Sequence, residues 1–394
     1  MPTRLRRAIS TNSLVAAYGA LFLFSSPASA QYYLFNRADF PANATFGGMA
    51  TADFNGDGTL DLAVVGSGPS GTLPPTQLVT VLMGKPDGTF AAPVEYQTGG
   101  ECGPITVGDF NGDGKPDLAL PCYLGAVSIL LGNGDGTFQA PRLTALAAFP
   151  ASLTTGDFNR DGKLDVAVIN GNQISVLLGN GDGTFQPPVE CPVESAANAF
   201  VNGLISGDFN GDGKLDLAVT HVNCPFGGPC VNNFVGILLG NGDGTFQPKV
   251  DYATAAGPQS LAAGDFNHDG NLDLAVVTTG CNKCGIQMVS ILLGKGDGTF
   301  GAHVEYQIPD QPYAVTLADL NEDGKLDLAV GGIDRFNNPT AGILLGNGDG
   351  TFQALVDYSG GVWAVGDFNR DGKVDLAFAT NSPGLSAVSI LLGN

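Results

Sequence analysis

The stretch DFNGDGKPD at residues 109–117 decides the fold, because the same pattern recurs along the whole chain. Successive copies of Asp-Phe-Asn-x-Asp-Gly-x-x-Asp start 48 to 57 residues apart, and only the sixth departs inside the pattern, with Leu320 in place of Phe. A sustained period of this length indicates a repeat architecture in which each repeat is one supersecondary unit. The seven copies start at Asp53, Asp109, Asp157, Asp208, Asp265, Asp319 and Asp367.

A second pattern, Gly-x-x-Asp-Gly-Thr-Phe, lies between successive copies of the first and supplies the chemistry of a tight turn. With both patterns as punctuation, each repeat is predicted to hold four strands. In the second repeat they are expected at 104–110, 117–120 and 126–131, with the fourth from about residue 138. The turn ends at Phe90, Phe138, Phe185, Phe246, Phe300 and Phe352.

The middle strands of each repeat are continuous apolar runs, which predicts burial on both faces. Four-stranded antiparallel units of this size, packed face to face around an axis, form a propeller. We therefore predict an all-β, seven-bladed β-propeller. The seventh repeat ends after its third strand, and residues 35–40 resemble the fourth strand of the sixth repeat at 352–358. Residues near 33–40 are expected to complete the last blade, which would protect its edge.

The N-terminus reads as a signal peptide over residues 1–30, and residues 31–394 as a single propeller domain. Three arginines within residues 4–7 precede an apolar stretch at 14–24 that is too short to span a bilayer, and Ala-Ser-Ala at 28–30 is a cleavage signal. An uncleaved anchor is the alternative. No later segment is apolar enough to cross a membrane, so we expect a secreted or cell-surface protein.

The net charge of −21 argues against nucleic acid or an anionic membrane as a partner. Much of this acid lies in the seven repeated loops, whose spacing resembles the front of an EF-hand calcium loop. Side-chain oxygens stand at loop positions 1, 3, 5 and 9, a backbone carbonyl at position 7 and glycine at position 6. Hard oxygen ligands favour calcium over zinc or copper, so up to seven calcium ions are predicted, one per blade.

The predicted side-chain ligands are Asp53, Asn55, Asp57 and Asp61; Asp109, Asn111, Asp113 and Asp117; Asp157, Asn159, Asp161 and Asp165; Asp208, Asn210, Asp212 and Asp216; Asp265, Asn267, Asp269 and Asp273; Asp319, Asn321, Asp323 and Asp327; and Asp367, Asn369, Asp371 and Asp375. The predicted carbonyl ligands belong to Thr59, Lys115, Lys163, Lys214, Asn271, Lys325 and Lys373. The alternatives are metal-free turns, or ions that serve stability and not function.

These loops and their period resemble the FG-GAP or VCBS-type repeats, related in architecture to the propeller of integrin α subunits. The resemblance covers essentially all of the chain after residue 30. It implies that the loops join the first and second strands of each blade and bind calcium. The literal FG and GAP strings are absent, so no ligand-binding residue is transferred from integrins.

Strand alternation places every acidic loop and every Asp-Gly-Thr-Phe turn at one end of the propeller. The other end, here called the irregular end, carries the connections between second and third strands and between blades. Its loops differ from one another, notably 66–77, 221–233, 279–286 and 331–340. Irregular loops on a rigid scaffold are where function usually resides.

All seven cysteines fall at or near the irregular end, and an extracellular context favours disulfides. Cys102 and Cys122 flank neighbouring antiparallel strands and are predicted to be bonded. Cys224 with Cys230, and Cys281 with Cys284, share loops and are predicted to form bridges; a C-x-x-C redox or zinc site is the alternative for the second pair. Cys191 is either free and buried or displaces one partner of the Cys224–Cys230 pair.

Three functions remain open. The first, which we favour, is a non-catalytic binding or adhesion module whose irregular end contacts an extracellular protein or glycan; seven equal sugar sites are disfavoured because the loops are not self-similar. The candidate contact residues, each also explicable by local packing, are Tyr123, Phe149, Phe200, Phe226, Phe336 and Asn337.

The second is a polysaccharide lyase or hydrolase, and the third a purely structural surface protein. The enzyme is disfavoured because no nucleophile–base pair or paired carboxylate stands apart from the acidic loops, and no catalytic residue is predicted. The acidic residues that leave an enzymatic function possible are Glu101, Glu190 and Glu194, and the histidines of the chain are His221, His268 and His303.

Overall fold

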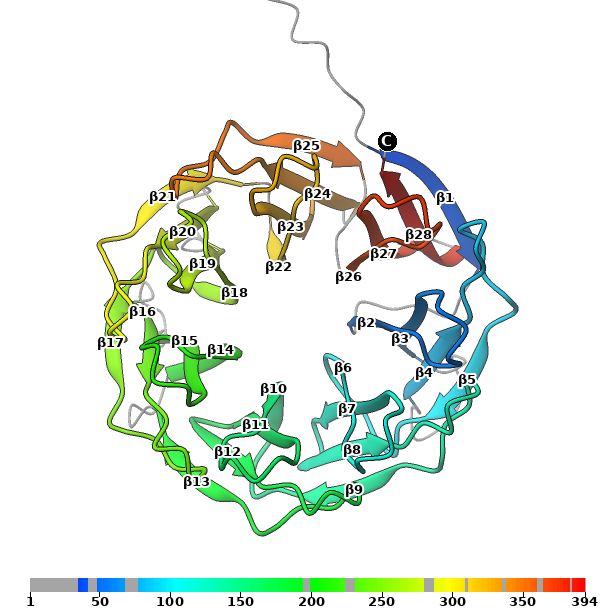
Figure 1. The fold of residues 1–394 in the computed structure, drawn as a ribbon, viewed down its shortest axis with the longest axis horizontal. Helices are drawn as coiled ribbons and strands as arrows, with labels where there is room; N and C mark the ends of the chain where they lie inside the picture. Colours follow the sequence, from blue (N-terminus) through cyan, green and yellow to red (C-terminus); the bar gives the residue numbers. More distant parts are fainter. Residues whose placement is uncertain are drawn as a thin grey trace, which may run out of the picture. The chain divides into compact units, whose positions relative to one another are not determined.

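The computed structural model describes residues 35–41, 48–67, 77–193, 199–223, 231–279, 287–308, 311–334, 338–359, 364–382 and 385–393. Within these ranges the protein contains strands and no helix. The unit from Leu34 to Asn394 is a ring of seven four-stranded antiparallel sheets, as predicted (Figure 1). The described residues include no helix that is long and apolar enough to cross a membrane.

In blades 1 to 6 the strands follow the chain from the innermost to the outermost position. Blade 1 contains β2 (Met49–Ala52), β3 (Asp61–Ser67), β4 (Gln77–Leu82) and β5 (Val94–Gln97). Blade 2 contains β6 (Thr106–Gly108), β7 (Asp117–Cys122), β8 (Ala126–Leu130) and β9 (Arg142–Ala145). Blade 3 contains β10 (Pro150–Gly156), β11 (Asp165–Asn170), β12 (Gln173–Leu177) and β13 (Val189–Pro192). Blade 4 contains β14 (Ala199–Gly207), β15 (Asp216–Asn223), β16 (Val231–Leu238) and β17 (Val250–Ala253).

Blade 5 contains β18 (Pro258–Gly264), β19 (Asp273–Thr278), β20 (Met288–Leu292) and β21 (Val304–Gln307). Blade 6 contains β22 (Pro312–Ala318), β23 (Asp327–Ile333), β24 (Pro339–Leu344) and β25 (Val356–Ser359). Blade 7 contains β26 (Ala364–Gly366), β27 (Asp375–Ser382) and β28 (Leu385–Gly393), and its outermost strand is β1 (Phe35–Pro41).

The prediction that an N-terminal strand completes the last blade is confirmed. Strand β1 pairs with β28 in antiparallel register from Phe35 opposite Gly393 to Pro41 opposite Ala387. The ring of Phe40 in β1 also contacts Phe90 of blade 1, with 5.0 Å between ring centroids. The strand therefore covers the edge of β28 and reaches the neighbouring blade, which closes the ring.

Several strand boundaries in blade 2 differ from the prediction, most of all in the inner and outer strands. The inner strand spans Thr106–Gly108 instead of 104–110, because Asp109 and Phe110 belong to the acidic loop and its hydrogen bonds. The outer strand starts at Arg142 and not near residue 138. Phe138 forms a single bridge with Gly132, and its ring packs against Phe54 of blade 1.

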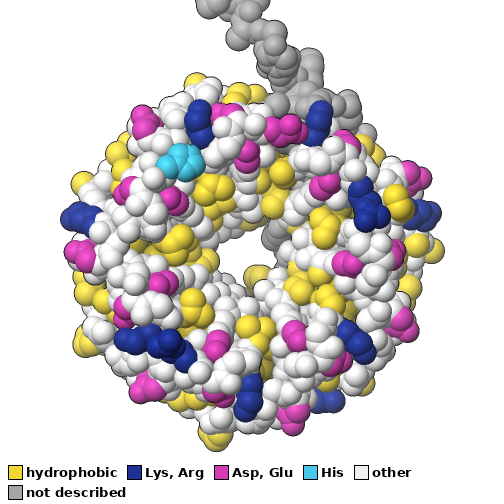
Figure 2. All heavy atoms as spheres, in the orientation of Figure 1, with side chains coloured by type: hydrophobic (Ala, Val, Ile, Leu, Met, Phe, Trp, Pro, Cys, Tyr) yellow, Lys and Arg dark blue, Asp and Glu magenta, His cyan; other side chains and the backbone are white. Residues whose placement is uncertain are grey.

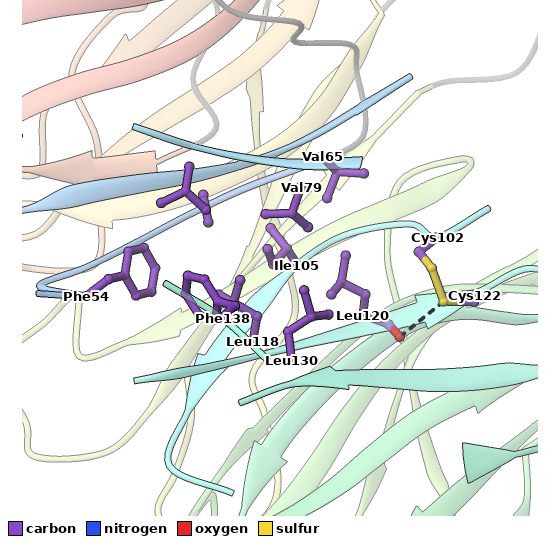
Figure 3. Packing of buried hydrophobic residues seen from close by; sticks show 12 residues of the cluster. Phe54, Val65, Val79, Cys102, Ile105, Leu118, Leu120, Cys122, Leu130 and Phe138 are labelled. Carbon is purple, nitrogen blue, oxygen red and sulfur yellow. Dashed lines mark hydrogen bonds between the residues drawn. A yellow bond between two sulfur atoms is a disulfide. The ribbon is translucent and has the colours of Figure 1, made fainter. Parts of the chain in front are cut away.

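The core lies between the blades, where the apolar faces of neighbouring sheets meet. All six residues of β7 are buried, the charged Asp117 among them. Figure 3 shows the layer between blades 1 and 2, in which Val65 and Val79 face Leu118 and Leu130. Burial of a side chain of this size contributes roughly 1.5–3 kcal/mol, so the repeated interfaces supply most of the driving force for folding.

A phenylalanine pair links successive blades and gives both repeat patterns a packing role. The Phe at loop position 2 of one blade contacts the turn Phe of the next, as Phe54 contacts Phe138 with 5.3 Å between ring centroids and 72° between planes. Edge-on contacts of this kind add to simple burial. The further pairs are Phe110–Phe185, Phe158–Phe246, Phe209–Phe300, Phe266–Phe352 and Phe368–Phe90.

Candidate functional site

The seven acidic loops share one hydrogen-bonding pattern, in which side-chain oxygens accept backbone N–H groups of the same loop. In the first loop Asp53 Oδ2 accepts from Gly58 at 2.7 Å, and Asp53 Oδ1 accepts from Asp57 at 3.0 Å. Asn55 Oδ1 also accepts from Asp57 N at 2.9 Å, and Asp57 Oδ1 accepts from Thr59 N at 2.7 Å. Concave clusters of backbone N–H groups stabilise negative charge, so the loop shape itself accommodates the first carboxylate.

The residue at the fourth loop position varies in type but not in backbone conformation. This residue adopts a left-handed backbone in every loop, with φ of 73° at Gly56 and 57° at His268. Glycine enters this region freely, whereas other residues lose about 1–2 kcal/mol there. Arg160, Glu322 and Arg370 also hold this conformation, at 60° to 61°, so four of the seven copies carry local strain.

The aspartate at the ninth loop position is buried and joins two segments of its blade by hydrogen bonds, so we call it a staple. The sequence analysis missed this role. Asp61 is fully buried, and its Oδ2 accepts from Phe54 N at 2.8 Å while its Oδ1 accepts from Gly84 N at 2.7 Å. Gly84 opens the Asp-Gly-Thr-Phe turn, so the carboxylate joins the acidic loop to that turn. A Cβ on Gly84 would lie under 3.0 Å from the carbonyl oxygen of Leu60, which explains the recurrent glycine.

The same two bonds recur in all seven blades. Burial dominates the electrostatics of these carboxylates and raises the pKa of each above its ordinary value of 3.8. The pKa rises to about 6 at Asp61, Asp117, Asp273, Asp327 and Asp375.

The donor set of each loop fits calcium by its chemistry. A carboxylate oxygen that accepts one N–H keeps a second lone pair for a cation. At position 5 the second oxygen already faces a positive group in several loops, as Lys214 Nζ lies 3.0 Å from Asp212 Oδ2. Within the described residues, no group of three or more His, Cys, Asp or Glu side chains is arranged to hold a metal ion. Calcium binding stays a prediction.

The acidic loops of blades 1 to 5 also contact the next blade through their backbone. The carbonyl of Phe54 accepts from Gly136 N of blade 2 at 3.0 Å, and the carbonyl of Phe110 accepts from Gly183 N of blade 3 at 2.9 Å. Three further blades repeat this bond. Figure 2 shows acidic side chains (magenta) spaced around one end of the ring, with apolar side chains at the rim of the central opening. Order in one loop therefore affects the joint between two blades.

At the irregular end the starts of the inner strands surround a pocket on the ring axis. Its volume is about 410 Å³, and blades 1 to 6 all contribute lining residues. Tyr123, a predicted contact residue, lies in its wall and is 42 % exposed. Phe149 and Phe200, at 72 % and 56 %, precede lining residues of β10 and β14. Leu124, 79 % exposed in the turn after β7, was missed by the sequence analysis.

Phe226, Phe336 and Asn337 lie outside the described residues, as do large parts of the irregular loops. The predicted Cys102–Cys122 disulfide is confirmed, and both residues are buried. Cys191 is free and half-buried, and burial raises the pKa of its thiol. The two predicted bridges within loops lie outside the described residues, so the pairing predicted there stays a prediction.

Glu190, His221 and His303, which the sequence analysis considered for an enzyme, have structural partners. Glu190 Oε2 accepts from Ser175 Oγ and from Gln173 Nε2, both at 2.7 Å, on the outer strands of blade 3. His221 is buried and lies 2.9 Å from a carboxylate oxygen of Asp251.

His303 pairs with Glu305 in β21, and His268 is the strained fourth residue of an acidic loop. Glu101 is exposed before β6, and its carbonyl accepts from Tyr123 N. Glu194 lies outside the described residues.

Comparison with known proteins bears on the fold and the family. The fold is similar to that of an Agrocybe aegerita lectin described as recognising non-reducing terminal N-acetylglucosamine, at 17 % identity and a TM-score of 0.54, covering 91 % of this chain and 95 % of that one. It is also similar to BBS1N in complex with ARL6DN, at 13 % identity and a TM-score of 0.57, covering 92 % and 97 %. Such low identities support the fold alone.

No curated protein matches the sequence. The family described as FG-GAP-like repeat matches residues 53–120, 121–168, 157–219, 228–276 and 279–330, which together make up more than half of the chain. Seven blades with one acidic loop each agree with that match. The chain therefore belongs to the FG-GAP-like repeat family of β-propellers.

Proposed function

We propose that this protein is an extracellular, non-catalytic binding and adhesion module that engages a protein or glycan with its irregular end. The observation that carries the proposal is that Tyr123, Leu124, Phe149 and Phe200, at that end of the neighbouring blades 2, 3 and 4, are all exposed, with Tyr123 in the wall of the axial pocket. Exposed apolar side chains that gather on one surface mark interaction sites. The opposite end repeats one acidic loop seven times, which suits a structural role.

In this proposal the acidic loops bind calcium and act as the stable half of the ring. The first, third, fifth and ninth side chains and the seventh carbonyl of each loop would hold the ion, which supplies the counter-charge for clustered carboxylates. Because the loop carbonyl at Phe54 bonds to the next blade, an ordered loop also stabilises the joint between blades. The signal peptide predicted over residues 1–30 would deliver the chain to a calcium-rich exterior.

The two proteins with similar folds are both described with a binding partner. One is a lectin described by its recognition of a terminal sugar, and the other is in complex with another protein. Both kinds of partner are compatible with a propeller, since function resides in the site and not in the fold.

The test is binding of residues 31–394 to arrays of glycans and extracellular proteins, with two matched double variants. Phe149→Ser with Phe200→Ser removes two exposed aromatics from the irregular end. Val250→Ser with Val304→Ser changes residues of similar exposure, 54 % and 55 %, on outermost strands. We expect the first pair to weaken binding and the second to leave it unchanged. Equal effects of both pairs, or the absence of any ligand, would contradict the proposal.

A further inference from the structure

The axial pocket is a formed cavity with the size of a small-ligand site. It occupies about 410 Å³ at the starts of β2, β10, β14, β18 and β22 and beside β6, and ligand pockets usually measure roughly 300–1,000 Å³. Six blades contribute to it, so the cavity exists only once the ring is assembled. It is a single site on the axis, unlike the sevenfold acidic loops.

Bonds between neighbouring blades fix the wall of this pocket. Asn202 Nδ2 donates to the carbonyl of Pro258 at 2.9 Å, and Thr220 Oγ1 donates to the carbonyl of Gln259 at 3.1 Å. A Cβ on Gly203 would lie 2.5 Å from that Gln259 oxygen, so only glycine permits this approach of blades 4 and 5. The lining side chains are held before any ligand arrives, and preorganisation of this kind lowers the cost of binding.

The tyrosine in the wall is equally constrained. Tyr123 N donates to the carbonyl of Glu101 at 2.7 Å, and the Cys102–Cys122 disulfide immediately precedes it. Its hydroxyl lies so close to Gly103 that a Cβ there would be 2.9 Å away. The ring remains 42 % exposed. The pocket therefore presents a fixed aromatic side chain with an apolar body and a polar tip.

The lining combines apolar side chains with polar, uncharged ones. Among the described residues that line the pocket there is no Asp, Glu, Lys, Arg or His. A charged ligand would lose hydration there without a counter-charge, which is costly. A purely aliphatic ligand would make no hydrogen bonds with the polar side chains of the lining. The side chains with hydrogen-bonding capacity are Tyr123, Ser152, Asn202, Gln259, Ser260 and Tyr313.

We propose that the axial pocket binds an uncharged sugar residue. A pyranose ring has an apolar face that suits a tyrosine and hydroxyl groups that suit serine, asparagine and glutamine side chains. The inference rests on the proposed binding role of the irregular end and narrows its partner to a neutral saccharide. The same chemistry is offered by a free sugar and by the end of a longer glycan, and the experiment separates these two sources.

The experiment uses residues 31–394 with calcium, probed by an array of neutral, sialylated and sulfated glycans and by calorimetry with methyl glycosides of hexoses and N-acetylhexosamines. Ser260→Trp fills the pocket with an indole. Asn172→Trp adds the same indole to the exposed turn after β11, at the same end but outside the pocket. We expect neutral glycans to bind, Ser260→Trp to weaken binding by at least about tenfold and Asn172→Trp to change it by less than about twofold.

Thermal unfolding checks that Ser260→Trp folds, and Tyr123→Leu provides a second variant expected to weaken binding without filling the pocket. Binding of methyl glycosides as strong as that of oligosaccharides identifies a free sugar as sufficient; stronger binding of oligosaccharides identifies a glycan end. A folded Ser260→Trp that binds like wild type overturns the pocket inference. If binding in that case still depends on Phe149 and Phe200, the proposed binding function stands while the pocket inference fails. Preference for sialylated or sulfated glycans over every neutral glycan also overturns the inference of a neutral sugar.

Discussion

The buried aspartate at the ninth loop position is expected to hold a blade together even when no metal is present. In blade 5, Asp273 Oδ2 accepts from Phe266 N at 2.8 Å and Asp273 Oδ1 accepts from Gly294 N at 2.8 Å. Asp273→Ala leaves two buried N–H groups without an acceptor. Each unsatisfied group costs about 1–3 kcal/mol, so the free energy of unfolding should fall by about 2–6 kcal/mol, less the relief of burying a charge.

The assay is urea unfolding followed by circular dichroism at pH 7 in excess chelator, so that loss of a metal ligand contributes nothing. The matched control is Asp297→Ala in the same blade, whose carboxylate accepts from Thr299 N at 2.9 Å at an exposed turn. Exposed substitutions usually change stability by less than about 0.5 kcal/mol. If both variants unfold at the same urea concentration as wild type, Asp273 is not a staple and the reasoning fails.

Three further predictions concern stability. Gly294→Ala should destabilise blade 5 by about 1–3 kcal/mol through overpacking, because the new Cβ would lie under 3.0 Å from the carbonyl oxygen of Leu272. In the control Gly301→Ala the nearest carbonyl oxygen lies 3.6 Å from the Cβ, so equal urea midpoints of the two variants would contradict this prediction. Reduction of the Cys102–Cys122 disulfide, or its replacement by two alanines, should lower the free energy of unfolding by about 3 kcal/mol for a loop of this length. The control Cys191→Ala should respond to reductant as wild type does, and an unfolding midpoint unaffected by reductant would refute the prediction. The metal-free protein should lose stability as pH rises from about 4 to about 7, because five staple aspartates have a pKa of about 6 in the folded protein and bind protons more tightly there than in the unfolded chain, where the pKa is 3.8. Their stabilising contribution is complete below pH 3.8 and is lost as the pH passes 6. A melting temperature that rises over this range in chelator would contradict the assignment.

The architecture was predictable because the same repeat pattern occurs seven times in the chain. The spacing of the acidic pattern gave the number of blades, and residues 35–40 matched an outer strand closely enough to predict the pairing of β1 with β28. The disulfide followed from the placement of Cys102 and Cys122 beside neighbouring antiparallel strands. Strand ends were less predictable. Phe138 was predicted to start the outer strand, but it precedes that strand and its ring packs on Phe54.

The candidate sites were only partly predictable. A buried staple and a metal ligand both require a carboxylate, so the sequence alone could not separate the two roles at Asp61. The glycines at the start of each turn were a usable signal, because a contact with a loop carbonyl excludes any Cβ. The axial pocket has no sequence signature, since its residues are spread over six repeats and meet only when the ring closes.

The most direct test of calcium-bound loops is the thermal unfolding midpoint of residues 31–394, measured first in calcium and then after addition of excess chelator. Ions that bind the folded state and not the unfolded chain raise its stability by mass action. We predict a large fall in the midpoint on chelation, restored by added calcium and not by magnesium. A midpoint that is the same in calcium and in chelator would contradict calcium-bound loops and leave that end of the ring to be held by packing and hydrogen bonds, including those of the buried aspartate staples.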